Sequence, residues 1–219
     1  MTPQPTSRTD RSAPQLYLVS PALDAGGASA ELLRAAVAAM PCAAVLLRLA
    51  DTDERARINC VKAIAPVLQQ AGVAVILDGH ADLVAKSGAD GAHLTGAAAF
   101  EASAASLRPK FIAGAGGLLT RHDAMLVAEQ GADYVMFGEP DSAGRRPPFA
   151  AAVERVNWWA ELFETPCVGY AGAADEVSPL VQAGAEFIAL GDFVFADRDR
   201  TGSILAAIAH DIAGRERTT

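Results

Sequence analysis

The amino-acid sequence predicts an α/β protein, a (β/α)8 barrel built as a single domain. Eight short apolar runs of strand length recur along the chain, and each is followed by an alanine-rich stretch with helical periodicity. Apolar runs without polar alternation are typical of strands covered on both faces, and helical crossovers make such strands parallel. A closed barrel and an open doubly wound sheet both fit this alternation. Eight near-equal units in 219 residues favour the barrel.

The predicted elements follow one another in strand-then-helix order. We expect strands at 16–20, 44–49, 73–79, 91–96, 111–116, 134–139, 167–172 and 187–192. We expect helices near 29–40, 54–71, 80–87, 97–105, 121–130, 149–163, 173–183 and 202–213. The barrel domain then covers residues 15–214, between a polar, proline-rich tail at 1–14 and a short tail at 215–219.

One short sequence motif, here called the repeated phrase, occurs three times along the chain. It reads GADGAHLTG at 88–96, GADYVMFGE at 131–139 and GAEFIALGD at 184–192. We expect each first glycine to follow a helix in the left-handed conformation, which glycine adopts at low cost. The apolar residues that come next then enter the barrel wall. The repeated phrase therefore predicts a structural turn ahead of the fourth, sixth and eighth strands.

Composition argues against several classes of partner. A net charge of −8 and a pI near 5.0 disfavour nonspecific binding of nucleic acid, which needs clustered Lys and Arg. The three cysteines lack the spacing of a disulfide framework or a zinc site, so a reducing cytoplasm fits best. Apolar stretches are too short to span a membrane, and the first 14 residues lack the apolar region of a signal peptide. We therefore expect a cytoplasmic protein without a nucleic-acid or membrane partner.

Four side chains near predicted strand ends are candidates for catalysis, because chemistry in such barrels sits at the carboxyl ends of the strands. They are Arg48, Asp78, His93 and Glu139. Arg48 ends an apolar strand and either binds a carboxylate or diphosphate or forms a salt bridge with Asp78. Asp78 is also the candidate ligand for Mg²⁺. His93 is a core histidine or a catalyst, and Glu139 is the best single candidate for a carboxylate in the cavity.

Small residues after the late strands indicate either an anion site or glycines that are needed only for tight turns. Backbone N–H groups near glycines can approach a phosphate closely, and the loops after strands seven and eight commonly bind phosphate in this fold. The arginines of the DSAGRRPP segment either close over an anionic ligand or are solvated. Asp192 counts against phosphate, because a carboxylate repels it. The candidate residues are Gly138, Gly172, Ala173, Gly191, Asp192, Arg145 and Arg146.

The sequence resembles the family of thiamine phosphate synthase and its sister, the thiazole tautomerase TenI. The likeness extends over about residues 15–212 and is carried by LYLVS, Arg48, VILDGHADLVAKSGADGAHLTG and GADYVMFGEP. The resemblance implies a (β/α)8 barrel, often a homodimer. It implies an enzyme that joins an aminopyrimidine diphosphate to a thiazole phosphate with magnesium and releases diphosphate.

Several family positions differ in this chain. Arg48 is retained from the second-strand signature, whereas the neighbouring Gln, Glu and Lys are replaced by Leu46, Leu49 and Ala50. The family's Asn-Asp pair after strand three is Asp78-Gly79, and its Thr-x-Thr-Lys loop after strand six is absent. Three functions are therefore weighed: the family reaction, a divergent TenI-like enzyme on another small phosphorylated ligand, and a non-catalytic barrel that binds phosphate or thiazole.

Overall fold

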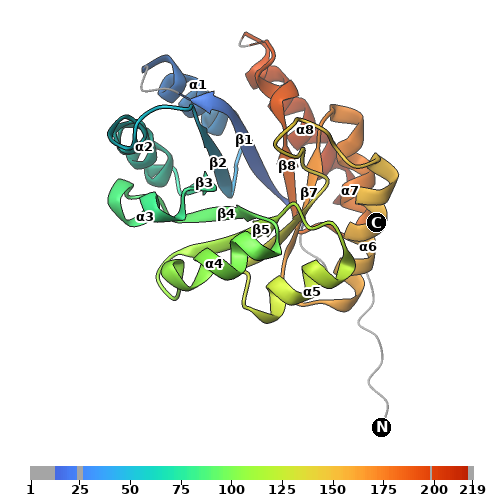
Figure 1. Cartoon of the computed structure of the whole chain (residues 1–219). Helices are drawn as coiled ribbons and strands as arrows, with labels where there is room; N and C mark the ends of the chain where they lie inside the picture. The colour runs from blue at the N-terminus through green and yellow to red at the C-terminus, as the bar shows by residue number, and fades with distance from the viewer. Residues whose placement is uncertain (1–12, 24–26, 198, 217–219) are drawn as a thin grey trace.

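The described residues form a closed barrel of eight parallel strands, β1 to β8 in chain order, with β8 pairing back to β1. This computed structural model describes residues 13–23, 27–197 and 199–216, and the helices lie outside the strands (Figure 1). The predicted (β/α)8 fold is thereby confirmed. The strands are β1 (Gln15–Leu23), β2 (Ala44–Leu49), β3 (Ala74–Asp78), β4 (Gly91–Thr95), β5 (Ile112–Gly116), β6 (Tyr134–Phe137), β7 (Cys167–Ala171) and β8 (Phe187–Leu190).

Eight α-helices alternate with the strands among the described residues. They are α1 (Gly27–Ala39), α2 (Glu54–Gln70), α3 (Ala81–Ser87), α4 (Ala97–Leu107), α5 (Arg121–Glu129), α6 (Phe149–Leu162), α7 (Val177–Ala183) and α8 (Thr201–Glu216). Short 3₁₀ helices, η2 (Ala174–Glu176) and η3 (Asp192–Phe195), follow β7 and β8. No helix of the described residues is long and apolar enough to cross a membrane.

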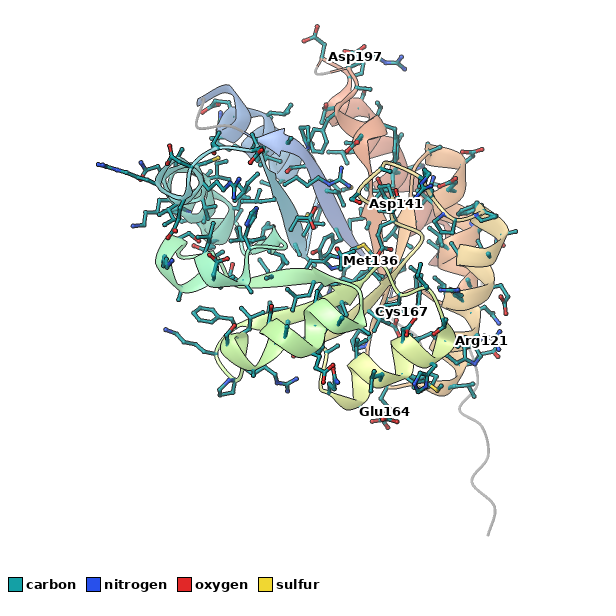
Figure 2. The ribbon with its side chains drawn as sticks, in the orientation of Figure 1. Arg121, Met136, Asp141, Glu164, Cys167 and Asp197 are labelled. Carbon is teal, nitrogen blue, oxygen red and sulfur yellow. The ribbon has the colours of Figure 1, made fainter. Side chains whose placement is uncertain are left out.

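Two apolar layers result from the alternation of side chains along each strand. Leu16 and Leu18 of β1 point outward into the layer between strands and helices. Tyr17 and Val19 point inward and pack against Met136 inside the barrel. In Figure 2, Met136 lies in the middle of the barrel and Asp141 lies on the loop that follows β6. The interior is thus filled by side chains, as expected for a barrel of this size.

Element boundaries differ from the sequence prediction at a few positions. β1 continues to Leu23, and its pairing with β2 shifts register between Val19 and Ala22. β6 ends at Phe137, so Glu139 lies in the following loop rather than in the strand. α8 extends to Glu216, beyond the predicted end of the domain at 214. Residues 1–12 and 217–219 of the two expected tails lie outside the described residues.

The repeated phrase has the predicted conformation. Gly88 and Gly184 follow α3 and α7 directly with φ of 84° and 93°, in the left-handed region. Gly131 comes two residues after α5 ends and has φ of 89°. Glycine is favoured there because a Cβ atom would meet the backbone in this conformation. These three turns direct the chain into β4, β6 and β8.

Two glycines of β5 make room for polar side chains inside the barrel. A Cβ atom at Gly114 would overlap the ring of Tyr134. A Cβ atom at Gly116 would overlap Glu139 Oε1 and the imidazole of His93. Ala113 and Ala115, which alternate with these glycines, are fully buried in the outer layer. The small residues of β5 therefore determine what can occupy the barrel centre.

Replacing Gly114 by alanine should destabilise the protein, because the new methyl group must displace a packed aromatic ring. We expect the free energy of unfolding to fall by about 1–3 kcal/mol, the usual cost of overpacking a core. Chemical denaturation monitored by circular dichroism measures this change.

Gly202→Ala serves as the matched control. A Cβ atom at Gly202 in α8 would make an ordinary contact with Ala39 at 3.9 Å. Alanine also has the higher helix propensity, so we expect stability to rise by up to about 1 kcal/mol. Equal stability of Gly114→Ala and wild type would contradict the steric argument.

Candidate functional site

A cavity of about 600 Å³ opens at the carboxyl ends of the strands. This volume lies within the range of small-molecule sites. Its lining comes from residues far apart in the sequence, because closure of the barrel places all strand ends on one rim. The titratable and polar residues in the lining are Arg48, Asp78, His93, Thr95, Glu139, Asp141, Ser142, Arg146, Tyr170 and Asp192.

Arg48 lies between two carboxylates at the rim. Its Nη1 donates a hydrogen bond to Asp192 Oδ1 at 2.9 Å, and its Nε lies 3.7 Å from Asp78 Oδ2. The side chain is about one quarter exposed, so the guanidinium faces the cavity while its charge is compensated. The two alternatives considered for Arg48 are therefore compatible, because it pairs with Asp78 and also faces the cavity where a ligand would bind. An anionic ligand must compete with Asp192 for it.

Glu139 reaches back from the loop after β6 to the centre of the rim. Its Oε1 accepts a hydrogen bond from the Gly117 N–H group and lies 4.0 Å from His93 Nε2. The Glu139 side chain is 13% exposed and that of His93 is 3% exposed. The glycine at position 116 allows these two groups to approach each other, as described above. A carboxyl group and an imidazole thus face each other at the floor of the cavity.

Burial sets the ionisation of this pair. Loss of solvation raises the pKa of Glu139 to about 7, although the Gly117 N–H group opposes the shift and the charge of Asp78 adds to it. Loss of solvation also lowers the pKa of His93, which favours the neutral imidazole. A carboxyl group with a pKa near neutrality can both accept and donate a proton under physiological conditions. The pair is therefore suited to proton transfer.

A carboxylate of the chain itself occupies the loop after β7. Glu176 Oε2 accepts hydrogen bonds from Gly172 N at 2.6 Å and from Arg146 Nη2 at 2.8 Å. Arg146 Nε also donates to the Gly138 carbonyl oxygen at 3.0 Å, and its guanidinium lies over the Tyr170 ring. These are the donors that a phosphate would use at a backbone N–H group and an arginine. In this structure Glu176 is the acceptor for these donors.

The residues predicted from the sequence come together to different degrees. Seven of them line the rim cavity: Arg48, Asp78, His93, Glu139, Arg146, Gly172 and Asp192. Gly138 and Gly191 lie beside the lining, where Gly138 accepts the Arg146 hydrogen bond and Gly191 packs under the Tyr170 hydroxyl. Arg145 points to solvent and pairs with Asp141 at 2.9 Å. Ala173 precedes η2 and is not among the lining residues. Phosphate binding by this set stays a prediction.

Sequence reasoning missed three polar residues of the site. Glu176 lies four residues after Gly172, and an acidic residue at that distance in a predicted phosphate loop was a usable signal. Tyr17 and Tyr134 occupy inward positions of β1 and β6, and Tyr134 donates to or accepts from both Tyr17 and His93. The glycines of β5 indicated that a large side chain fills the interior, although they did not show which one.

The described residues do not fit a protein-built magnesium site. Among them no group of three or more His, Cys, Asp or Glu side chains is placed to hold a metal ion. Asp78, the predicted ligand, lies beside the guanidinium of Arg48. Mg²⁺ is commonly held by one or two carboxylates together with waters and substrate phosphates, and the carboxylate of Asp78 is already paired with Arg48.

The ionisation of Glu139 predicts a pH-dependent stability. Its pKa in the folded protein, about 7, lies above the ordinary value of 4.5, so the native state holds the proton more tightly than the unfolded chain. The free energy of unfolding should therefore fall as the pH rises from about 4.5 to about 7, by on the order of 3 kcal/mol. Denaturation of wild type and Glu139→Gln across this range measures the difference.

In Glu139→Gln the free energy of unfolding should lack this dependence on pH, because the amide of glutamine does not ionise. Glu129→Gln is the control, since Glu129 is an exposed residue at the end of α5 and should keep the wild-type slope. If the free energy of unfolding changed equally with pH in wild type and in Glu139→Gln, Glu139 would titrate at its ordinary pKa.

Similarity to known proteins agrees with this architecture. Residues 16–193 match the family described as Thiamine monophosphate synthase (TMP-TENI). The thiamine-phosphate synthase of Rhodospirillum centenum is 38% identical over 184 residues, which cover 80% of this chain and 86% of the relative. The enzyme of the same name from Hyphomonas neptunium is 32% identical over 215 residues and covers 94% and 95% of the two chains.

Solved structures show the same fold at lower identity. The thiamine phosphate pyrophosphorylase of Pyrococcus furiosus superposes with a TM-score of 0.71 at 20% identity, over 90% of this chain and 96% of that one. The 3-hexulose-6-phosphate synthase of Salmonella typhimurium superposes with a TM-score of 0.68 at 15% identity, over 90% and 99%. At these identities the likeness concerns the fold. On the strength of the matched residues and the curated relatives, this chain belongs to the thiamine monophosphate synthase family.

Proposed function

We propose that the chain forms thiamine phosphate in the rim cavity, by joining an aminopyrimidine diphosphate to a thiazole phosphate in the cytoplasm. The observation that carries the proposal is the meeting of seven predicted site residues around one cavity at the carboxyl ends of the strands. Family membership supports the choice of substrates, because the curated relatives named above are thiamine-phosphate synthases.

In this reaction the diphosphate leaves and a pyrimidinyl-methyl cation remains, which the thiazole nitrogen captures. The protein mainly supplies charge stabilisation and positioning. We assign Arg48 to the departing diphosphate, because its guanidinium faces the cavity and presents a planar set of donors. Binding would exchange Asp192 for the ligand as the partner of Nη1.

A second function is favoured by the pairing of Arg146 with Glu176. The chain already fills an anion position that a diphosphate would need, so a divergent TenI-like enzyme on another small phosphorylated ligand fits the site as well. A barrel that binds phosphate or thiazole without catalysis is the remaining alternative. The Glu139–His93 pair supports an enzyme over a passive binder.

Product formation decides between these functions. The purified chain is incubated with the two thiamine precursors, with and without magnesium, and thiamine phosphate is measured by fluorescence after oxidation. Turnover supports the proposal, and the two arms test the magnesium dependence that the resemblance implies. Ligand-induced thermal stabilisation without turnover would support the alternatives. Light scattering on the same sample tests the expected homodimer.

Arg48→Ala should lower turnover and weaken the thermal stabilisation produced by inorganic diphosphate, because the cavity loses the guanidinium that we assign to the diphosphate. A loss of about 100-fold in kcat/KM corresponds to about 2.7 kcal/mol of transition-state stabilisation. Arg34→Ala is the matched control, since Arg34 is exposed on α1 and pairs with Glu31. If inorganic diphosphate stabilised Arg48→Ala as much as wild type, the assignment of Arg48 to the diphosphate would be wrong.

Glu176→Ala should strengthen anion binding, because it frees the Gly172 N–H group and the Arg146 guanidinium. We expect the Kd for inorganic phosphate, measured by calorimetry, to fall about tenfold, equivalent to about 1.4 kcal/mol. Glu129→Ala removes an acidic residue of equal charge on the exposed end of α5 and should leave the Kd unchanged. Weaker binding in Glu176→Ala would mean that Glu176 supports the site rather than occupying it.

A further inference from the structure

A row of buried polar groups crosses the interior of the barrel and ends at the rim cavity. Tyr17 Oη lies 2.9 Å from Tyr134 Oη, and Tyr134 Oη lies 3.1 Å from His93 Nδ1. On its other side, His93 Nε2 faces Glu139 Oε1 at 4.0 Å. The two tyrosines and His93 are at most 7% exposed. The row links β1, β6 and β4 to the loop after β6.

The row also lies between two cavities. Tyr17 and Tyr134 line a second, largely apolar cavity of about 330 Å³ at the amino ends of the strands. His93 and Glu139 line the rim cavity at the opposite end. A buried polar chain of this kind is costly unless each member is hydrogen-bonded. Each member of the row has a polar partner, so the row is compatible with burial in an otherwise apolar interior.

The donors of this row can be assigned from chemistry. Burial raises the pKa of both tyrosines, so their hydroxyl groups keep their protons and act as donors. The neutral imidazole of His93 has one N–H group and one acceptor nitrogen. An ionised Glu139 only accepts, so a proton on Nε2 is favourable and a lone pair there is repulsive. Nδ1 must then accept from Tyr134, which in turn accepts from Tyr17.

We propose that Glu139 exchanges a proton with the bound ligand and that the rest of the row positions it. Tyr17 and Tyr134 fix the tautomer of His93, so that the Nε2–H group of His93 faces the Glu139 carboxylate. Glu139 is the catalytic residue, because it is the most exposed member and lines the cavity. The other three are positioning residues, which act through it. The tautomer of a histidine is generally fixed by the hydrogen bond that its other nitrogen makes.

The inference deepens the proposed function and rests on it for the identity of the ligand. When the diphosphate leaves, positive charge spreads onto the amino group of the pyrimidine and makes its N–H bond acidic. The proton of that bond moves to a Glu139 oxygen, and the bonding electron pair stays on nitrogen and neutralises the cation. The carboxyl group returns the proton when the thiazole nitrogen forms the new C–N bond. No oxidant, reductant or further reactant is needed.

The charged surroundings are compatible with this role. The groups that face Glu139 are Asp78 from β3, Arg155 from α6, His93 from β4 and Tyr134 from β6. Arg155 donates to the Leu118 and Leu119 carbonyl oxygens, so its charge is held at the loop that carries Gly117. The 4.0 Å gap to His93 is longer than a hydrogen bond, and catalytic hydrogen bonds commonly shorten when the ligand binds.

Nuclear magnetic resonance of the full chain tests the positioning role without requiring turnover. Labelling with ¹⁵N at histidine reports the tautomer, and labelling with ¹³C at the glutamate carboxyl reports its titration. Signals are assigned by their loss in His93→Gln and Glu139→Gln. We expect His93 to carry its proton on Nε2 in wild type. Tyr134→Phe should shift the proton toward Nδ1 and raise the pKa of Glu139, because the carboxylate then faces a lone pair.

Two further variants separate positioning from general destabilisation. Tyr17→Phe should change the tautomer in the same direction by a smaller amount, because it acts through Tyr134. Thr201→Val removes another buried hydroxyl, which donates to the Val194 carbonyl oxygen at 2.9 Å, and should lower the melting temperature without changing either signal. A Tyr134→Phe spectrum identical to that of Thr201→Val would overturn the positioning role.

Activity tests the catalytic assignment separately. Where wild type makes thiamine phosphate, Glu139→Gln should lose about 100-fold in kcat, within the usual contribution of general acid–base catalysis. Tyr134→Phe should raise the apparent pKa in the pH profile of kcat, in the same direction as the expected change in the pKa of Glu139. Full turnover by Glu139→Gln would reject its catalytic role and leave the proposed function standing. If wild type makes no thiamine phosphate, the proposed function fails and the resonance data still decide the positioning role.

Discussion

Closure of the parallel sheet is the constraint on which the site depends. β8 pairs with β1, so residues as distant in sequence as Arg48 and Asp192 come within hydrogen-bonding distance. An open sheet would leave the first and last strands at opposite edges. The same closure encloses an interior whose filling is decided by inward side chains, and the glycines of β5 leave space there for an aromatic ring and a carboxyl–imidazole pair.

The charge balance of the rim distinguishes this chain from a simple anion pocket. Arg48 is held between Asp78 and Asp192, and Arg146 is paired with Glu176. Each arginine is therefore neutralised before a ligand arrives, and an incoming phosphate gains only the difference between itself and the carboxylate that it replaces. Selectivity under these conditions depends on shape and on hydrogen bonds more than on net attraction.

Sequence patterns predicted the fold well, because strand–helix alternation and apolar runs are local signals that the barrel preserves. They also predicted that Arg48, Asp78, His93 and Glu139 share one rim, since strand ends are readable from the sequence. They could not predict that Glu139 folds back from a loop to His93, because that contact depends on the missing side chain at Gly116 of another strand. The partners of Arg146 were equally hidden, as the loop conformation that presents Glu176 has no periodic signature.

Arg146 joins two loops that the chain order keeps apart. Its guanidinium contacts the Gly138 carbonyl oxygen after β6, the Tyr170 carbonyl oxygen at the end of β7 and the Glu176 carboxylate beyond it. Gly138 is the immediate neighbour of Glu139. A single guanidinium therefore holds the Gly138 peptide, next to Glu139, together with the loop that carries Glu176. The loops after β6 and β7 share Arg146 as a common hydrogen-bond partner, so a change at this one position would affect both of them.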